Sequence, residues 1–153
     1  MTEKNYRRTI TVNASAEEAY LALTTGYEHW WTACDEQFNE IGDRIKFTFP
    51  ARVSYWTFEA LKLERNRAVE LECVEAFHKI TEKPNAPETE WLGSRALWRI
   101  EPRGEQTDIH FIHDGLTPDL DCYNVCEAGW NSFFVGSLKS YLDTGVGIPA
   151  QAD

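Results

Sequence analysis

One long amphipathic segment near the end of the chain, from about Asp121 to Asp143, constrains the fold more than any other feature. Its apolar residues recur every three or four positions, the spacing of one helical face: Tyr123, Cys126, Trp130, Phe133, Phe134, Leu138, Tyr141 and Leu142. Gly145 favours a left-handed helix stop, and Pro149 prevents the helix from resuming. Because most of the preceding chain is typical of short strands, this helix must bury a wide aromatic stripe against a sheet. A sheet wrapped round one helix leaves an internal hollow, which is the first candidate for function.

The rest of the chain predicts a meander of strands with two short helical pieces near its start. Residues 6–13 alternate and are rich in Ile, Val and Thr, as expected of a strand. Asn13 or Ser15 can cap a short helix that Gly26 breaks, and a helical turn over residues 27–31 follows. The further predicted strands are 37–41, 44–49, 53–64, 68–76, 92–101 and 106–114. Short turns between consecutive strands imply an antiparallel sheet, and helices outside the meander place the fold in the α+β class.

The strand over residues 53–64 contains an irregularity in its pattern. Trp56 and Phe58 fall on one parity of the two-residue strand period, whereas Leu61 and Leu63 fall on the other. Since a slip of one residue moves a side chain to the opposite face of a sheet, we expect a bulge in this strand.

Composition and charge limit the classes of function. At 153 residues, with 42% hydrophobic and 13% aromatic residues, the chain suits one domain over residues 1–153. A formal net charge of −10 argues against nucleic-acid binding, which needs clustered Lys and Arg, and against anionic membrane surfaces. No apolar run approaches the roughly 18 residues of a membrane helix, and residues 1–6 lack the apolar stretch of a signal peptide. We therefore expect a cytoplasmic protein without a membrane or nucleic-acid partner.

Neither a metal nor a cofactor is expected from the motifs. The four cysteines, Cys34, Cys73, Cys122 and Cys126, form no CxxC pair, and no two histidines have metal-ligand spacing. Cys122 and Cys126 share one face of the predicted helix, where they are better interpreted as small apolar spacers than as a redox pair. The chain also lacks a phosphate loop, a dinucleotide fingerprint and a nucleophile elbow.

His113 is the one candidate for catalysis. It shares a strand face with Ile109 and Phe111, so on a concave sheet its imidazole would point toward the hollow. There it could act as a general base or as a hydrogen-bond partner of a ligand. Alternatively, it fixes the Asp114-Gly115 turn by bonding to the backbone. We favour this second interpretation because a single histidine without a partner is not a mechanism.

Several short motifs, in order along the chain, resemble those of a known family. The matching segments are Ser15–Thr24, Trp30-Trp31, Gly42–Phe49, Trp98–Leu116 and Gly129–Pro149. Together they resemble the START-like (SRPBCC, or helix-grip) superfamily, within the group named after the activator of heat-shock protein 90 ATPase. Each motif is short, but the match covers essentially the whole chain.

The resemblance implies a seven-stranded antiparallel sheet that grips the C-terminal helix, with a cavity between them. The superfamily includes lipid-transfer domains, polyketide cyclases, plant hormone binders and co-chaperone domains, so the fold cannot name the activity. We expect a module that binds a small apolar or aromatic molecule. A polyketide cyclase or hydrolase that uses His113, and a contact with a heat-shock protein 90 chaperone, remain alternatives. The oligomeric state is left open.

The predicted cavity lining comes from the inward faces of the strands, from the helix and from Trp31. Of the adjacent residues Trp30 and Trp31, we expect one to be a buried anchor and the other to close the cavity entrance. We predict that these residues contact the ligand: Trp31, Trp56, Phe58, Trp98, Phe111, His113, Trp130 and Phe134.

Overall fold

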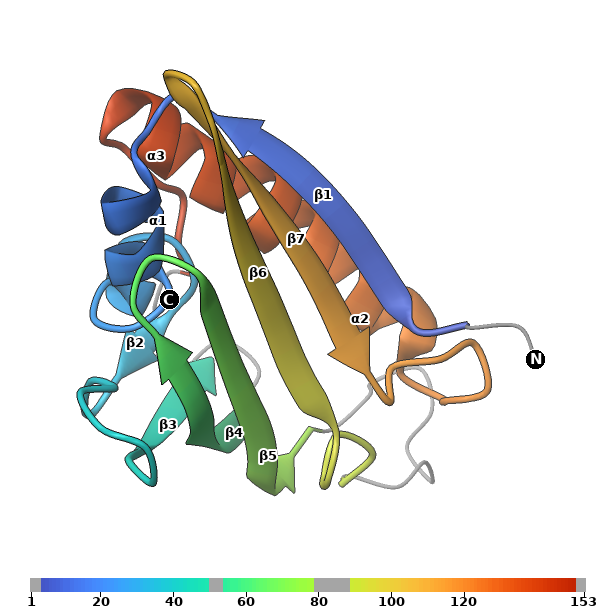
Figure 1. Ribbon diagram of the computed structural model, residues 1–153. Coiled ribbons are helices and arrows are strands. Elements are labelled where there is room, and N and C mark those ends of the chain that lie inside the picture. Colours follow the sequence, from blue (N-terminus) through green and yellow to red (C-terminus); the bar gives the residue numbers. More distant parts are fainter. Residues whose placement is uncertain (1–3, 50–53, 79–88, 151–153) are drawn as a thin grey trace.

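A curled antiparallel sheet of seven strands wraps round one long helix (Figure 1). The computed structural model describes residues 4–49, 54–78 and 89–150. The strands are β1 (Tyr6–Val12), β2 (Ala33–Cys34), β3 (Arg44–Phe49), β4 (Ser54–Glu64), β5 (Ala68–Phe77), β6 (Arg95–Arg103) and β7 (Gln106–Asp114). Their order in the sheet is β1-β7-β6-β5-β4-β3-β2, so the first strand pairs with the last. The α+β helix-grip fold implied by the resemblance is confirmed.

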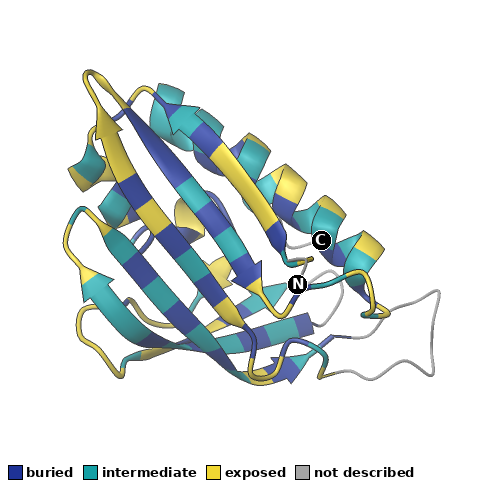
Figure 2. Ribbon diagram, turned by 45° about the vertical axis from the view of Figure 1, so that its right-hand side comes forward, coloured by how far each residue is buried: buried dark blue, intermediate teal, exposed yellow. Residues whose placement is uncertain are grey.

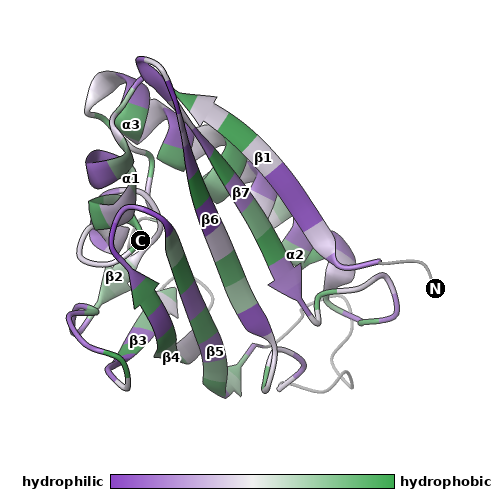
Figure 3. Ribbon diagram, in the orientation of Figure 1, coloured by the Kyte–Doolittle hydropathy of each residue, from purple (hydrophilic) through white to green (hydrophobic). Residues whose placement is uncertain are grey.

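The strands alternate between the buried and exposed sides of the sheet (Figure 2). In β4, residues at every second position from Ser54 to Ala60 are buried, and Figure 3 shows matching bands of hydrophobic and hydrophilic residues along β6. The predicted bulge is confirmed, because the pairing of β4 with β5 shifts register between Thr57 and Phe58 and again between Ala60 and Lys62. The concave face therefore carries the aromatic side chains that meet the helix.

The predicted strand over residues 37–41 is wrong, because this segment folds as a loop. The Asp43 carboxylate accepts hydrogen bonds from the backbone N–H groups of Asn39 and Glu40, at 2.8 and 2.9 Å. Such local bonds between side chain and backbone compete with strand pairing. Phe38 is nevertheless buried in the core, and its N–H donates to the carbonyl of Thr24. The strand that pairs with β3 here is β2, two residues long.

The two short helical pieces pack two tryptophans into the core. Ser15, rather than Asn13, caps α1 (Ala16–Ala22) in a reciprocal box with Glu18. After the short helix η1 (Tyr27–His29), the Trp30 indole donates to the carbonyl of Ala22 at 2.8 Å. Trp30 and Trp31 are both buried, although their adjacency suggested that only one would be.

The predicted C-terminal helix is confirmed as continuous from Tyr123 to Thr144, but its middle is a π-helix. It consists of α2 (Tyr123–Trp130), a π-helical stretch η3 (Asn131–Leu138) and α3 (Lys139–Thr144), and it ends at Gly145 with a φ of 87°. The apolar periodicity could not distinguish the wider π turns from α turns. Among the described residues, no helix combines the length and hydrophobicity needed to cross a membrane.

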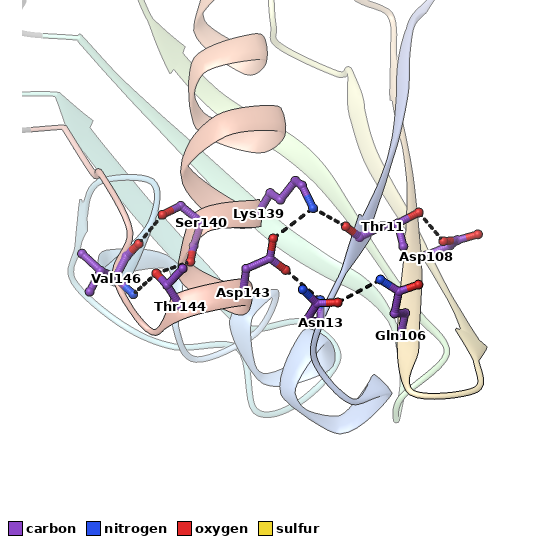
Figure 4. Close-up of polar contacts among 9 residues, drawn as sticks. All are labelled: Thr11, Asn13, Gln106, Asp108, Lys139, Ser140, Asp143, Thr144 and Val146. Atoms are coloured by element: carbon purple, nitrogen blue, oxygen red, sulfur yellow. Dashed lines mark hydrogen bonds and ion pairs between the residues drawn. The ribbon is translucent and has the colours of Figure 1, made fainter.

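A group of polar contacts, which we call the clamp, fastens the end of the helix to the sheet (Figure 4). The Lys139 ammonium donates to the Thr11 carbonyl at 2.6 Å and to the Asp143 carboxylate at 2.9 Å. The other oxygen of Asp143 accepts the Asn13 N–H at 2.7 Å, and the Gln106 amide donates to the Asn13 side chain at 2.8 Å. The clamp fixes α3 against β1 and the β6–β7 hairpin.

The tail beyond the helix returns to the tryptophan pair. The Ser137 hydroxyl donates to the Trp30 carbonyl at 2.7 Å and accepts the Ile148 N–H, and the Ala150 N–H donates to the Trp31 carbonyl at 2.8 Å. A Cβ on Gly147 would clash with the His29 carbonyl oxygen, so only glycine fits this close approach without displacing backbone.

The clamp predicts a pH-dependent contribution of Asp143 to stability. Burial raises the pKa of Asp143, but hydrogen bonds from Asn13 and Lys139 outweigh burial and lower it overall. A carboxyl group whose pKa is lower in the folded state stabilises the fold above its unfolded pKa of about 3.9. It loses that contribution as the pH falls through the folded pKa. We expect Asp143→Asn to lower the free energy of unfolding at neutral pH by about 1–2 kcal/mol. The difference from wild type should shrink below about pH 4.

Urea denaturation across this pH range measures both effects. Asp119→Asn is the matched control, because Asp119 is exposed and lies outside the clamp. Equal losses of stability in the two variants would contradict a specific role of the clamp.

Candidate functional site

A cavity of about 620 Å³ opens between the first half of the long helix and the β3–β4 edge of the sheet. This is the opposite end of the helix from the clamp. Its lining is mostly apolar and consists of Trp31, Phe49, Ser54, Trp56, His78, Trp91, Asn124, Val125, Cys126, Ala128, Gly129, Trp130, Phe133 and Ala150. The volume lies within the range of about 300–1,000 Å³ that small-molecule sites occupy.

Four tryptophans form one wall of the cavity. The Trp31 and Trp130 rings stack with centroids 5.0 Å apart, and the Trp56 and Trp91 rings stack at 4.4 Å. Trp91 also lies parallel to Trp130, with an interplanar angle of 7° at 5.9 Å. Parallel rings at these separations present flat apolar surfaces suited to an aromatic or planar ligand.

One polar group of the wall is unsatisfied. The Trp56 indole N–H is buried and has no hydrogen-bond partner among the described residues. A buried donor without an acceptor costs free energy. The described residues thus leave one donor within the wall unpaired.

His113 lies behind the tryptophan wall rather than in the cavity. Its Nδ1 accepts the Trp130 indole N–H at 2.9 Å, and its Nε2 lies 2.9 Å from the Ser94 hydroxyl. Since the indole can only donate, the proton of the neutral imidazole sits on Nε2 and is donated to Ser94. The Ser94 hydroxyl in turn donates to the Trp91 carbonyl at 2.6 Å. Burial lowers the pKa of His113 to about 3, so the ring is neutral at physiological pH.

The eight residues predicted to contact the ligand fall into two layers. Trp31, Trp56 and Trp130 line the cavity. The other five are buried behind that lining, each at most 1% exposed: Phe58, Trp98, Phe111, His113 and Phe134. This second layer supports the first, since the Phe111 ring packs edge-on against Trp130 at 4.6 Å.

Trp91 and His78 are among the lining residues that sequence reasoning missed. Trp91 follows the polar segment 81–90, which gave it no periodic context, although a tryptophan at the end of a polar loop is itself a signal. His78 comes directly after β5, and its ring lies 5.2 Å from that of Trp56.

His78 also meets the two cysteines at the start of the helix. The potential ligand atoms of His78, Cys122 and Cys126 all lie within 4.8 Å of one another, and all three residues are buried. The Trp91 indole donates to the Cys126 sulfur at 3.2 Å. A hydrogen bond from Cys126 lowers the pKa of the Cys122 thiol to about 6 against the effect of burial, and His78 contributes to the same shift. In the same pair, the bond with Cys122 and burial raise the pKa of Cys126.

A larger depression of about 1300 Å³ on the outer face of the sheet has a different character. Charged side chains dominate it, and Lys62 lies within 4 Å of carboxylates on both Glu64 and Glu70. Such exposed pairs are typical of a solvated surface. We therefore take the internal cavity as the candidate site.

Comparison with known proteins agrees with this architecture. A family model described as Activator of Hsp90 ATPase homolog 1-like protein matches residues 13–143. The solution structure of the Aha1 dimer from Colwellia psychrerythraea is 29% identical, with a TM-score of 0.75 over 96% of this chain and 100% of that chain. No curated protein sequence gave a significant match.

More distant structures share the fold alone. Protein MLL2253 from Mesorhizobium loti is 19% identical, with a TM-score of 0.66 over 86% of this chain and 93% of that one. CalU16 from Micromonospora echinospora is 15% identical, with a TM-score of 0.64 over 92% of this chain and 77% of that one. The family model spans most of the sequence, and the sheet and helix have the arrangement that the START-like fold requires. The chain therefore belongs to the Activator of Hsp90 ATPase homolog 1-like family of START-like proteins.

Proposed function

We propose that the protein binds a small, largely apolar molecule with a planar or aromatic group in the cavity beneath α2. The observation that carries this proposal is the preformed cavity of about 620 Å³ walled by four tryptophans. The START-like fold supports ligand binding in general terms, and the cavity supplies the chemical class.

The alternative of an enzyme that uses His113 as acid or base has less support. Both ring nitrogens of His113 are engaged within the protein, by Trp130 and Ser94, and the side chain is fully buried. A general base must reach the proton that it abstracts, directly or through one water. The contacts of His113 instead suit a positioning role for the tryptophan wall.

A chaperone contact is a second candidate, favoured by the family match and by the 29% identity to an Aha1 dimer. The direct test is the ATPase rate of an Hsp90 chaperone with and without the protein. Stimulation that persists when the cavity is filled would assign this contact to an outer surface.

The cavity can be filled by substitution at Gly129. This residue lines the cavity from α2, and a Cβ placed on it meets no atom within 4 Å. We expect Gly129→Leu to weaken binding of a neutral aromatic probe, 1-aminoanthracene, by at least about tenfold, because the new side chain occupies the probe's space. Stability should be kept or raised, since glycine costs a helix about 1 kcal/mol.

Fluorescence titration of the probe and thermal unfolding measure the two effects. Gly136→Leu is the matched control, because Gly136 is an exposed glycine of the same helix outside the cavity lining. Native mass spectrometry would also detect a co-purifying small molecule in wild type that Gly129→Leu lacks. Probe binding equal in all three proteins would contradict the proposal.

The positioning role of His113 predicts a pH effect on stability. Its pKa is about 3 in the folded protein and near 6.5 when unfolded, so between these values the unfolded state binds more protons. Stability should therefore fall as pH drops below about 6.5. His113→Gln should lower the free energy of unfolding at neutral pH by about 1–3 kcal/mol, because it leaves the buried Trp130 and Ser94 groups poorly bonded. It should also weaken the dependence of stability on pH.

The measurement is the free energy of unfolding between neutral and acidic pH. His29→Gln is the control, since His29 is exposed. The role would be refuted if His113→Gln kept the wild-type dependence of stability on pH. It would also be refuted if this variant alone lost a catalytic turnover while remaining stably folded.

A further inference from the structure

Three potential metal ligands from positions far apart in the sequence meet beside the cavity. His78 is the first residue after β5, Cys122 is the N-cap of α2, and Cys126 lies one helical turn further on. Their exposed fractions are 8%, 1% and 6%, and their potential ligand atoms are all within 4.8 Å of one another. The fold thus assembles a His-Cys-Cys group that the spacing of the cysteines did not predict.

The size and chemistry of this group suit zinc. In a tetrahedral zinc site with bonds of about 2.0–2.3 Å, ligand atoms lie about 3.5–3.8 Å apart. The three atoms lie within 4.8 Å of one another and would therefore need to close by about 1.3 Å at most. Thiolate and imidazole ligands select zinc over magnesium or calcium, which prefer oxygen. Two cysteines and one histidine with a fourth, open position form the ligand set of a catalytic-type zinc site.

The surroundings of the group fix its members in place. The Trp91 indole donates to the Cys126 sulfur at 3.2 Å. The two carboxylate oxygens of Glu90 accept the N–H groups of Asp121 and Cys122, each at 2.9 Å, and so hold the start of α2. Outer contacts of this kind orient metal ligands and tune their affinity.

A second group of potential ligands, on the outer face of the sheet, is weaker. It consists of Glu101, Asp108 and His110, which are at least partly committed to other partners. Asp108 accepts from Thr11 and Arg103, and His110 bonds to Thr9 and Glu101. These contacts account for the group without an ion.

We propose that His78, Cys122 and Cys126 bind one zinc ion. Because His78 and Cys126 line the cavity, an ion held by the three residues would lie beside it, and its fourth position would be left to a water molecule or to the cavity's occupant. A bound ion would present a Lewis acid to an oxygen, nitrogen or sulfur atom of the cavity's occupant. Only this last step rests on the proposed function, since the three ligands hold the ion without any organic molecule.

Cobalt(II) titration of the full chain, stripped with chelator and kept reduced without oxygen, tests the site. We expect one equivalent of cobalt to give a thiolate-to-cobalt charge-transfer band in the near ultraviolet and tetrahedral d–d bands in the visible. One equivalent of zinc should displace both. Cys122→Ser, Cys126→Ser and His78→Gln should each weaken cobalt binding by more than about 100-fold, since losing a ligand costs more than losing an outer contact.

Cys34→Ser is the matched control, because Cys34 is a free, half-buried thiol outside the group. It should bind cobalt as wild type does. Circular dichroism without metal shows whether each variant folds. If a variant does not fold, the intensity of the wild-type band still counts the bound thiolates, and two are required.

Absence of the charge-transfer band in wild type would overturn the proposal. So would a band that survives in both Cys122→Ser and Cys126→Ser, or one that Cys34→Ser removes. Cobalt is measured without a cavity ligand, and 1-aminoanthracene is measured in chelator. Failure of the metal site is therefore distinguishable from failure of the proposed function.

Discussion

The hydrogen bond from the Trp130 indole to the buried His113 fixes where the long helix lies on the sheet. Without it, two polar atoms would be enclosed in an aromatic core with no partner, at a cost of about 1–3 kcal/mol for each. The bond also sets the proton of the imidazole on Nε2, and through Ser94 it reaches the backbone of Trp91. The positions of Trp130 and Trp91, and thus the shape of the cavity wall, depend on this one chain of contacts.

Most of the fold could be predicted because it follows from periodicity. The aromatic stripe of the helix, the alternation of the strands and the parity change at Leu61 are local patterns with one structural solution each, and all three predictions are confirmed. The failures have equally local causes. Side-chain bonding by Asp43 replaced a strand with a loop. The π-helical turns of η3 were missed because an apolar stripe fits either kind of helix.

The site was less accessible to sequence reasoning because it depends on register and on loops. The alternation of the strands assigned the correct residues to the concave face. It could not distinguish the residues that line the cavity from those that are buried behind them. Trp91 and His78 flank segments without periodicity, so nothing in the sequence indicated their direction. The meeting of His78 with Cys122 and Cys126 follows only from the way in which the end of β5 lies beside the start of α2.

The clamp at Lys139 and Asp143 lies at one end of the helix, and the cavity lies at the other. Residues that secure the fold are thus distinct from those that shape the binding space. Val125, Ala128 and Phe133 line the cavity without belonging to the fully buried core. Mutation at these three positions can alter what the cavity accepts while leaving the anchorage of the helix intact. Such a division lets new specificities arise by drift and selection with little loss of stability, which is one physical route by which a single scaffold comes to serve many ligands.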